Sequence, residues 1–311
     1  MRKRRGAAGA IVALMLLLSA AACGDDSGGG TGSADTTAAK GSVTVGSFNF
    51  SESVLLANLY AKALEDAGYK VTVRANLGAR EIVFPALEKG EIDLVPEYLG
   101  NALAYVAKDA AKPGDDEATT VTKLKDALTP KQLSLLTPSD ATDGDIIAVT
   151  KATADQYSLE KISDLAPLAK DMTLGGPPEC PTRITCGLGL DQVYGLKFKA
   201  FKALDTGGAI TKAALEKGEV DVARLFSADA AIKDKKFVIL DDDKFIQPAG
   251  NVVPVLRTEV VDDELTKVLD KISSTLTTGD LTTMNTKIDV DKQDPDKVAE
   301  EYLIDKGIIE G

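Results

Sequence analysis

The chain of 311 residues contains no histidine and no tryptophan. Without histidine, it can form no Ser-His-Asp hydrolase site, no Cys-His protease site, no HExxH metalloprotease site and no metal site with imidazole ligands. The sequence also lacks a G-x-x-x-x-G-K-[ST] loop, and no G-x-G-x-x-G follows a predicted strand, so nucleotide chemistry has no support. An enzyme would have to work with Asp, Glu or Lys alone. We therefore expect a protein that is not an enzyme and that holds no cofactor and no metal.

Basic residues are outnumbered by acidic ones. Asp and Glu number 48 against 36 Lys and Arg, which gives a formal net charge of −12 at pH 7. Such a chain is a poor match for DNA or RNA, whose phosphates attract a basic surface. Hydrophobic residues make up 44% of the chain, so a sizeable core can be buried. The length suits one large domain or two lobes of about 100–150 residues each.

The first 22 residues have the features of an export signal. Four basic residues at positions 2–5 precede an apolar segment at 10–18, and small residues then lead to Cys23. This order is typical of a signal peptide, and the alternative is a single membrane-anchor helix. Small residues that run into a cysteine resemble the lipobox of bacterial lipoproteins, in which the cysteine is lipidated. Ala20 departs from the usual Leu of that motif, and an ordinary signal peptide is the alternative.

The segment after Cys23 holds almost no side chains that a fold could bury. Residues 24–40 are rich in Gly, Ser, Thr and Asp, a composition typical of a flexible tether. We therefore interpret 1–22 as a signal peptide and 23–41 as a lipid-anchor cysteine with its tether. This arrangement predicts an extracytoplasmic protein held at the cell membrane by lipid. No second hydrophobic stretch of membrane length follows.

Cys180 and Cys186 lie six positions apart in this exported chain. An oxidising compartment favours a disulfide between them, which would close a tight loop. Chain-entropy arithmetic gives so short a loop a stabilisation of roughly 2 kcal/mol. Two free thiols are the alternative, whereas two sulfurs without His or further Cys under-coordinate zinc.

The rest of the chain alternates strand and helix patterns. The predicted strands are 42–47, 70–74, 91–95, 146–149, 172–174 and 219–222, and the predicted helices are 52–67, 80–89 and 210–217. The order β-α-β-α-β at the start is typical of a parallel sheet with helices on its faces. The stretch from about residue 258 is predicted to be rich in helix and to pack on the first lobe.

One segment occurs twice. Residues 86–94 read Ala-Leu-Glu-Lys-Gly-Glu-Ile-Asp-Leu, and residues 214–222 read Ala-Leu-Glu-Lys-Gly-Glu-Val-Asp-Val. Each copy fits a helix that ends at a glycine and is followed by a strand. The repeat predicts two similar α/β lobes. A small ligand would bind in the crevice between them, beyond the carboxyl ends of the strands.

Several motifs resemble those of one family. They are Gly46-Ser-Phe-Asn-Phe-Ser-Glu52, Ala75-Asn-Leu-Gly78, Gly90-Glu-Ile-Asp-Leu-Val-Pro-Glu-Tyr-Leu-Gly100, Gly175-Gly-Pro-Pro-Glu179, Gly187-Leu-Gly-Leu190, Val193-Tyr-Gly-Leu-Lys-Phe198, Leu240-Asp-Asp-Asp-Lys244 and Val253-Pro-Val-Leu-Arg257. Over about residues 42–310, the chain resembles the substrate-binding lipoproteins of bacterial ABC importers for glycine betaine, choline, carnitine and related osmoprotectants.

The resemblance implies an α/β fold of the two-lobed periplasmic-binding-protein type, or Venus flytrap, of class II. Lobe I would comprise residues 42–142 and 253–311, and lobe II residues 143–252. The chain would cross between them near 140–146 and 247–254. The implied partners are a small solute, an ABC permease and its ATPase, and the protein is expected to be a monomer that transports rather than transforms its ligand.

Members of this family hold a quaternary ammonium in a cage of tyrosines by cation–π attraction, and Arg, Lys or polar donors hold a carboxylate. Carried over by position, Tyr98 matches a cage tyrosine and Arg183 a carboxylate-binding arginine. Asn101 stands where a pocket Thr is common. Asp143 matches an aspartate of some members.

Other positions depart from the family pattern. Phe48 stands where Lys or Gln is common, Asp145 aligns with one cage tyrosine and Phe226 with another. The last cage tyrosine maps to the segment Pro248-Ala249-Gly250 and is absent. An aromatic and acidic pocket favours a cation, Arg183 favours an acidic group, and a zwitterion suits both. The alternatives are an aromatic or other amine solute, a sensor rather than an importer component, and structural roles for these side chains.

Overall fold

The computed structural model describes residues 40–108, 110–112, 114–229 and 231–311. The predicted signal peptide, Cys23 and the tether as far as residue 39 lie outside the described residues. Within the described ranges, we find no helix whose length and hydropathy would let it traverse a bilayer.

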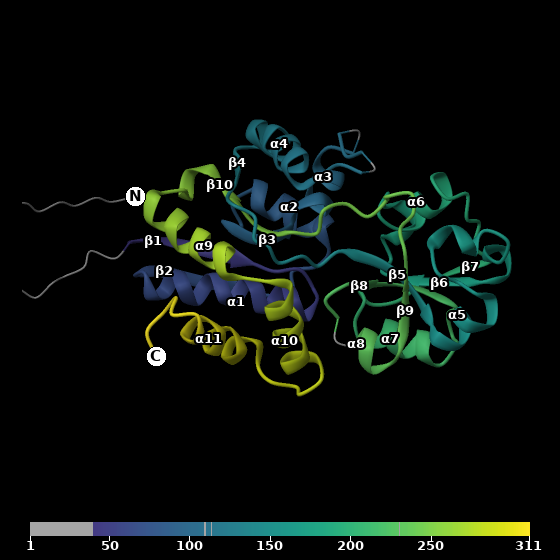
Figure 1. The fold of residues 1–311 in the computed structure, drawn as a ribbon. Coiled ribbons are helices and arrows are strands. Elements are labelled where there is room, and N and C mark those ends of the chain that lie inside the picture. Colours follow the sequence, from purple (N-terminus) through teal and green to yellow (C-terminus); the bar gives the residue numbers. More distant parts are fainter. Residues whose placement is uncertain (1–39, 109, 113, 230) are drawn as a thin grey trace, which may run out of the picture. The chain divides into compact units, whose positions relative to one another are not determined.

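The strands form two five-stranded sheets (Figure 1). In the first sheet, the order is β2-β1-β3-β10-β4, from β2 (Tyr69–Arg74), β1 (Lys40–Gly46), β3 (Leu94–Tyr98), β10 (Val252–Arg257) and β4 (Leu133–Leu135). In the second sheet, the order is β7-β6-β8-β5-β9, from β7 (Ala200–Ala203), β6 (Thr173–Gly176), β8 (Val222–Phe226), β5 (Asp145–Thr150) and β9 (Phe237–Leu240). These sheets confirm the predicted α/β fold with two lobes.

The two sheets share one plan of connection. In the first sheet, β2, β1 and β3 are parallel and β10 runs antiparallel to them. In the second sheet, β7, β6 and β8 are parallel and β5 is antiparallel. In the first sheet, the chain passes from β1 to β2 on one side and then to β3 on the other side of β1. In the second sheet, it passes in the same way from β6 to β7 and then to β8. The connections therefore change direction between β1 and β3 and between β6 and β8. Ligands of open α/β sheets bind beyond the carboxyl ends of the strands at such a point.

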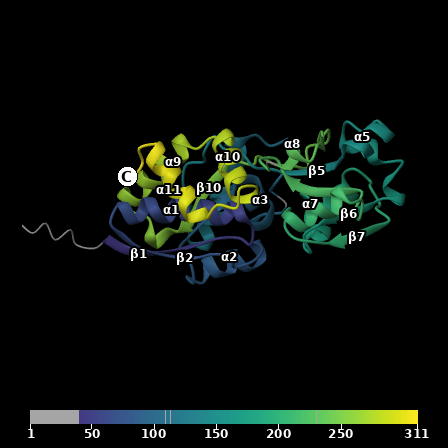
Figure 2. The same cartoon turned by 90° about the horizontal axis from the view of Figure 1, so that it is seen from below.

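Helices cover both sheets. They are α1 (Ser51–Asp66), α2 (Arg80–Glu88), α3 (Leu99–Val106), α4 (Glu117–Leu128), α5 (Lys151–Tyr157), α6 (Gly187–Gln192), α7 (Ala209–Glu216), α8 (Ala231–Asp234), α9 (Asp263–Thr275), α10 (Thr278–Asp289) and α11 (Pro295–Asp305). Figure 2 shows α9, α10 and α11 beside α1, whereas α5 and α7 lie with the second sheet. The C-terminal helices thus add to the lobe that the N-terminal strands begin.

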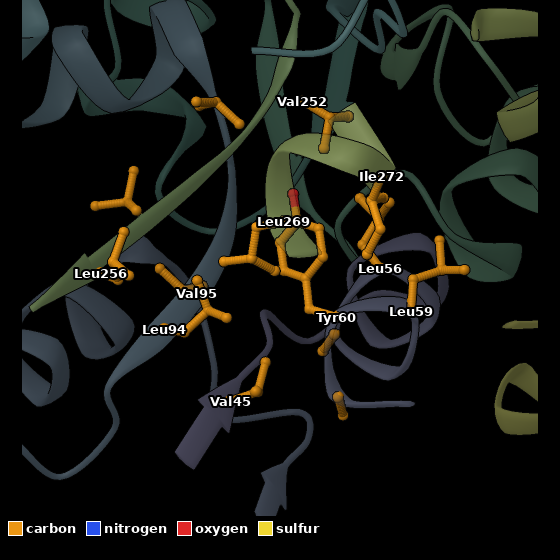
Figure 3. Packing of buried hydrophobic residues seen from close by; sticks show 14 of the residues in the cluster. Val45, Leu56, Leu59, Tyr60, Leu94, Val95, Val252, Leu256, Leu269 and Ile272 are labelled. Atoms are coloured by element: carbon orange, nitrogen blue, oxygen red, sulfur yellow. The ribbon is translucent and has the colours of Figure 1, made fainter. Parts of the chain in front are cut away.

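The larger hydrophobic core lies between the first sheet and these helices (Figure 3). Leu56, Leu59 and Tyr60 of α1 are almost wholly buried with Val45 of β1 and Leu269 of α9. Residues from the two ends of the chain thus share one core, so the C-terminal helices are part of this lobe's stability.

The second sheet has smaller cores of its own, and one of them contains the predicted disulfide. Cys180 and Cys186 are joined by a disulfide bond. Both are buried with Leu174 of β6 and Leu190 of α6. The cross-link therefore ties the loop after β6 to the start of α6.

The repeated segment adopts the same turn in both sheets. Gly90 and Gly218 have φ of +73° and +69°, a left-handed conformation that glycine adopts without a steric penalty. Three residues later, the side chains of Asp93 and Asp221 each accept a hydrogen bond of 2.8 Å from a backbone N–H of the neighbouring strand. The backbone N–H groups of Asp93 and Asp221 also donate to the carbonyls of Thr44 and Thr173, so each turn leads directly into its strand. The strands begin at Leu94 and Val222, so the predicted starts at 91 and 219 are three residues early.

The chain passes from the first sheet to the second between β4 and β5, and it returns between β9 and β10. The two connections lie against each other, since the Asp143 N–H donates to the carbonyl of Gly250 at 2.9 Å. A Cβ on Gly250 would lie 2.8 Å from the backbone nitrogen of Gly144. Only glycine at position 250 permits so close an approach.

Candidate functional site

Aromatic side chains from both sheets meet beyond the carboxyl ends of the parallel strands. Phe48 and Phe50 follow β1, Tyr98 ends β3 and Phe226 ends β8. The ring centroid of Phe50 lies 5.0 Å from that of Phe226, 6.1 Å from that of Tyr98 and 5.9 Å from that of Phe48. Phe50 and Tyr98 of the first lobe therefore both lie against Phe226 of the second lobe.

Next to these rings is a cavity of about 20 Å³, which we call the central cavity. Its lining includes the aromatic side chains Phe48, Phe50, Tyr98 and Phe226, the guanidinium groups Arg80, Arg183 and Arg224, and the amide of Asn101. This volume holds roughly one water molecule, so the structure shows the cleft closed around its own side chains.

Two of the guanidinium groups already cover aromatic rings of this cavity. Arg80 forms a buried pair with Glu97 through bonds of 2.7 and 2.8 Å, and its guanidinium lies 4.9 Å from the ring centroid of Phe48. Arg224 forms a buried ion pair with Asp145 and lies 3.8 Å from the centroid of Phe226. Burial lowers the pKa of Arg224 to about 9. Both guanidinium groups are thus paired with carboxylates of the protein itself, and the lining of the central cavity carries side chains of both charges.

Arg183 connects the two lobes. Its guanidinium lies 2.8 Å from the carboxylate of Glu81 in α2 and 3.3 Å from that of Glu179. Burial opposes the ionisation of Glu81, but the hydrogen bond and the charge of Arg183 outweigh it and hold the pKa of Glu81 below its usual range. The carboxylate-binding position predicted for Arg183 is thus occupied by a carboxylate of the protein itself.

The hydroxyl of Tyr98 points to a buried carboxylate. It donates to Glu52 at 2.6 Å, and the side-chain amide of Asn285 donates to the other oxygen of Glu52 at 2.5 Å. Burial raises the pKa of Glu52 despite these two bonds and a third one to the carboxyl group of Asp143. Burial, followed by the negative charge of Glu52, raises the pKa of Tyr98 well above its usual value, so the phenol stays protonated and donates.

Asp143 lies in the first connection between the sheets. Its carboxylate accepts hydrogen bonds from the backbone N–H of Ala228 at 2.7 Å and from the hydroxyl of Ser227 at 3.2 Å. Burial and the charge of Glu52 raise its pKa well above the usual range. The first connection is thereby bonded to the end of β8 in the second lobe.

Glu52 and Asp143 face a second cavity, of about 220 Å³, which we call the acidic cavity. Its lining includes five carboxylates, two aromatic rings and one amide, namely Glu52, Asp143, Asp205, Asp229, Asp289, Phe50, Phe226 and Asn285. Phe50 and Phe226 also line the central cavity, so the two cavities adjoin at this pair of rings.

Most of the residues predicted from the sequence are brought together here. Those that line the central cavity are Phe48, Tyr98, Asn101, Arg183 and Phe226, and those that line the acidic cavity are Asp143 and again Phe226. Asp145 is not among the described residues that line either cavity. It is bonded to Arg224, to the hydroxyl of Thr185 at 3.1 Å and to the amide of Asn101 at 3.4 Å.

The segment that lacks the last cage tyrosine packs tightly on α3. A Cβ on Gly100 would lie 2.2 Å from the Cβ of Pro248, and the Gly100 N–H donates to the carbonyl of Ala249 at 2.8 Å. Pro248 thus fills the space next to the cleft with its own ring. No aromatic side chain is present at these positions to complete a cage.

Several residues of the site are absent from the sequence prediction, namely Phe50, Glu52, Arg80, Arg224, Asn285 and the aspartates Asp205, Asp229 and Asp289. Phe50 and Glu52 belong to a motif that was recognised, and their spacing from Phe48 was the signal that could have identified them. Asn285 lies on α10, 233 residues after Glu52. No local pattern connects two residues so far apart.

Comparison with known proteins gives a consistent result. The family model for the substrate-binding domain of ABC-type glycine betaine transport systems matches residues 41–305. The glycine-betaine-binding protein of Pseudomonas aeruginosa is 27% identical over 84% of this chain and 87% of its own. The glycine betaine-binding protein YehZ of Escherichia coli is 28% identical over 86% of this chain and 92% of its own.

Solved structures show the same likeness. A crystal structure described as a glycine betaine/carnitine/choline ABC transporter superposes with a TM-score of 0.67 and 26% identity, and the match covers 86% of this chain and 99% of that one. The likeness therefore extends over both sheets and the cleft.

Proposed function

Because the chain belongs to the family of substrate-binding domains of ABC-type glycine betaine transport systems, we propose that it captures a small quaternary-ammonium or zwitterionic solute between its lobes. It then delivers this solute to a membrane permease that is driven by an ATPase. The observation that supports this proposal most directly is the meeting of aromatic rings, guanidinium groups and buried carboxylates from both sheets. A zwitterion requires groups of both charges within one cleft.

In this proposal, lobe I comprises residues 42–142 and 253–311, and lobe II residues 143–252. The lobes rotate about the paired connections at Asp143 and Gly250. The central cavity of about 20 Å³ cannot hold such a solute by itself, so we expect an open state that closes on the ligand. X-ray scattering should show a smaller radius of gyration at saturating ligand. Identical profiles with and without ligand would contradict the clamp.

The proposed ligand class is tested by isothermal titration calorimetry with glycine betaine, carnitine and choline. Binding of at least one member and its recovery unchanged by mass spectrometry would support a receptor. Uptake of the same labelled solute by cells, lost on deletion of the chain, separates import from sensing. Binding of none of these solutes would refute the ligand class.

We further propose that a lipid on Cys23 anchors the mature protein, as a monomer, to the outer surface of the cell membrane. The lipobox-like residues before Cys23 support this proposal. Cys23→Ser should move the protein from the membrane fraction to the soluble extracytoplasmic fraction. Retention of the variant in the membrane fraction would refute the lipid anchor.

A further inference from the structure

We infer that the cleft contains a further subsite, between α3 and the loop that the disulfide closes, and that this subsite takes an apolar substituent of the solute, such as a short acyl chain. The inference rests on the proposed function and narrows its ligand class. It selects those quaternary-ammonium or zwitterionic solutes that carry such a substituent, because a solute as small as glycine betaine would leave the subsite empty.

The subsite is a third cavity, of about 370 Å³, which we call the outer cavity. Arg80, Asn101 and Arg183 line both the outer and the central cavity, so the two adjoin at these side chains. Pockets that hold small molecules have volumes of about 300–1,000 Å³, and the outer cavity falls in this range. A ligand seated at the rings of the central cavity therefore has room to extend past the shared side chains.

Both lobes supply apolar walls to the outer cavity. Ala104 and Tyr105 lie three and four residues after Asn101, so α3 presents all three on one face. Ile184 of the disulfide loop and Leu188 of α6 form the opposite wall. The four apolar or aromatic side chains are half-buried, so part of their surface is still in contact with water. A substituent that covers this surface is stabilised by the hydrophobic effect.

The charged groups of the lining favour a neutral substituent. Arg80 is paired with Glu97 and Arg183 with Glu81, so an anionic substituent would have to compete with carboxylates of the protein. The other charged side chain of the lining, Lys108, is exposed and hence hydrated. An apolar substituent leaves both ion pairs and this hydration in place.

The acidic cavity is a separate space and does not suit an apolar group. No described residue lines both the outer and the acidic cavity. Five carboxylates line the acidic cavity, and an apolar chain placed there would remove water from them without supplying a hydrogen bond. The substituent is therefore assigned to the outer cavity.

The wall in lobe II is held in place before any ligand arrives. Ile184 lies inside the loop that the Cys180–Cys186 disulfide closes. A Cβ on Gly189 would overlap the carbonyl oxygen of Ile184, so the loop packs directly on α6. The Leu188 N–H donates to the carbonyl of Arg183 at 3.2 Å, which ties both ends of the wall together. A preformed wall does not have to be ordered on binding, which favours affinity.

Calorimetry of the full-length protein with carnitine, O-acetylcarnitine and O-butyrylcarnitine tests this inference, because the three solutes share one ammonium and one carboxylate group. We expect the dissociation constant to fall about fivefold or more from the acetyl to the butyryl ester, since two further methylene groups leave water. Equal, weaker or no binding of the butyryl ester would overturn the inference. Binding of glycine betaine or carnitine by the same protein would then leave the proposed function intact, whereas binding of no solute, choline included, would overturn both.

Variants locate the subsite. Ala104→Phe should fill part of the outer cavity, so the ratio between the dissociation constants of the two esters should fall below about twofold. Ala152→Phe makes the same change at an exposed position of α5 and should keep the ratio of the unaltered protein. Equal ratios in the two variants, with circular dichroism showing that both are folded, would overturn the placement. Leu188→Ala removes part of the opposite wall and should also lower the ratio, so it decides the placement if Ala104→Phe fails to fold.

Discussion

Tyr98 and Phe226 face each other across the cleft with ring centroids 6.5 Å apart, and each ends the equivalent strand of its sheet. They also occupy equivalent positions of the internal repeat, since 226 − 98 equals 214 − 86, the offset between its two copies. They differ by one hydroxyl, which Tyr98 uses to hold Glu52. The repeat thus supplies matching aromatic positions, and the hydroxyl makes one of them a hydrogen-bond donor.

Tyr98→Phe should destabilise the protein by about 1–3 kcal/mol at neutral pH, because a buried carboxylate loses one of its two donors. Urea unfolding measures this loss. Tyr60→Phe is the matched control, since Tyr60 is equally buried and its hydroxyl forms no hydrogen bond found among the described residues. An equal and small effect of both substitutions would show that the bond from Tyr98 to Glu52 contributes little.

Glu81→Gln should raise the affinity for carboxylate-bearing ligands by up to about fivefold, or about 1 kcal/mol. The ion pair with Arg183 is partly exposed, so its loss costs little, and the ligand then competes only with the longer contact from Arg183 to Glu179 at 3.3 Å. Calorimetry with choline, which has no carboxylate, provides the control and should show no gain. A fall in affinity for every ligand would instead identify the pair as a latch that stabilises closure.

Arg183→Ala should weaken binding of carboxylate-bearing ligands at least tenfold, about 1.4 kcal/mol. Reduction of the Cys180–Cys186 disulfide should have a similar effect, because Arg183 lies inside the loop that this bond closes and a mobile loop must be ordered on binding. We expect reduction to add little to Arg183→Ala. Full binding by the reduced protein would contradict this dependence.

Reduction should also lower the melting temperature. The short loop predicts a loss of roughly 2 kcal/mol, and the two cysteines are buried in a core of the second lobe. The expected decrease is a few degrees, measured by differential scanning calorimetry with and without reductant. An unchanged melting temperature would show that packing alone holds the loop.

The stability of the unliganded protein should fall as the pH rises above about 4.5. The pKa values of Glu52 and Asp143 are raised in the folded state, so that state binds protons that the unfolded state has released. The negative charge of Asp289 raises the pKa of Glu52 further, whereas the positive charge of Arg224 lowers the pKa of Asp143. Urea unfolding between about pH 5 and pH 8 measures the slope, and Asp143→Asn should flatten it.

Cation binding should show the opposite dependence. A cationic ligand favours ionised carboxylates, so its affinity should increase over the same pH interval and its binding should release protons to the buffer. Calorimetry in buffers of different ionisation enthalpy measures this release. Affinity that does not change with pH would show that the charge of the bound solute does not act on Glu52 and Asp143.

The order of strands and helices could be predicted from the sequence because periodicity and glycine positions carry that information. The exact strand starts could not, because they depend on the position of the neighbouring strand, which pairs in register only from Leu94 and Val222. Resemblance located Tyr98, Arg183 and Phe226 in the cleft. The bond from Asn285 to Glu52 joins residues 233 positions apart, and no local pattern indicates it.

Asp143 belongs both to the backbone between the sheets and to the lining of the acidic cavity. Its N–H is bonded to Gly250 in the return connection, and its carboxylate is bonded to the end of β8. If the lobes rotate as proposed, a ligand that contacts Asp143 therefore binds at a residue of the connection itself. Ligand binding and the rotation of the lobes would then be coupled through Asp143 directly, without other residues between the ligand and the connection.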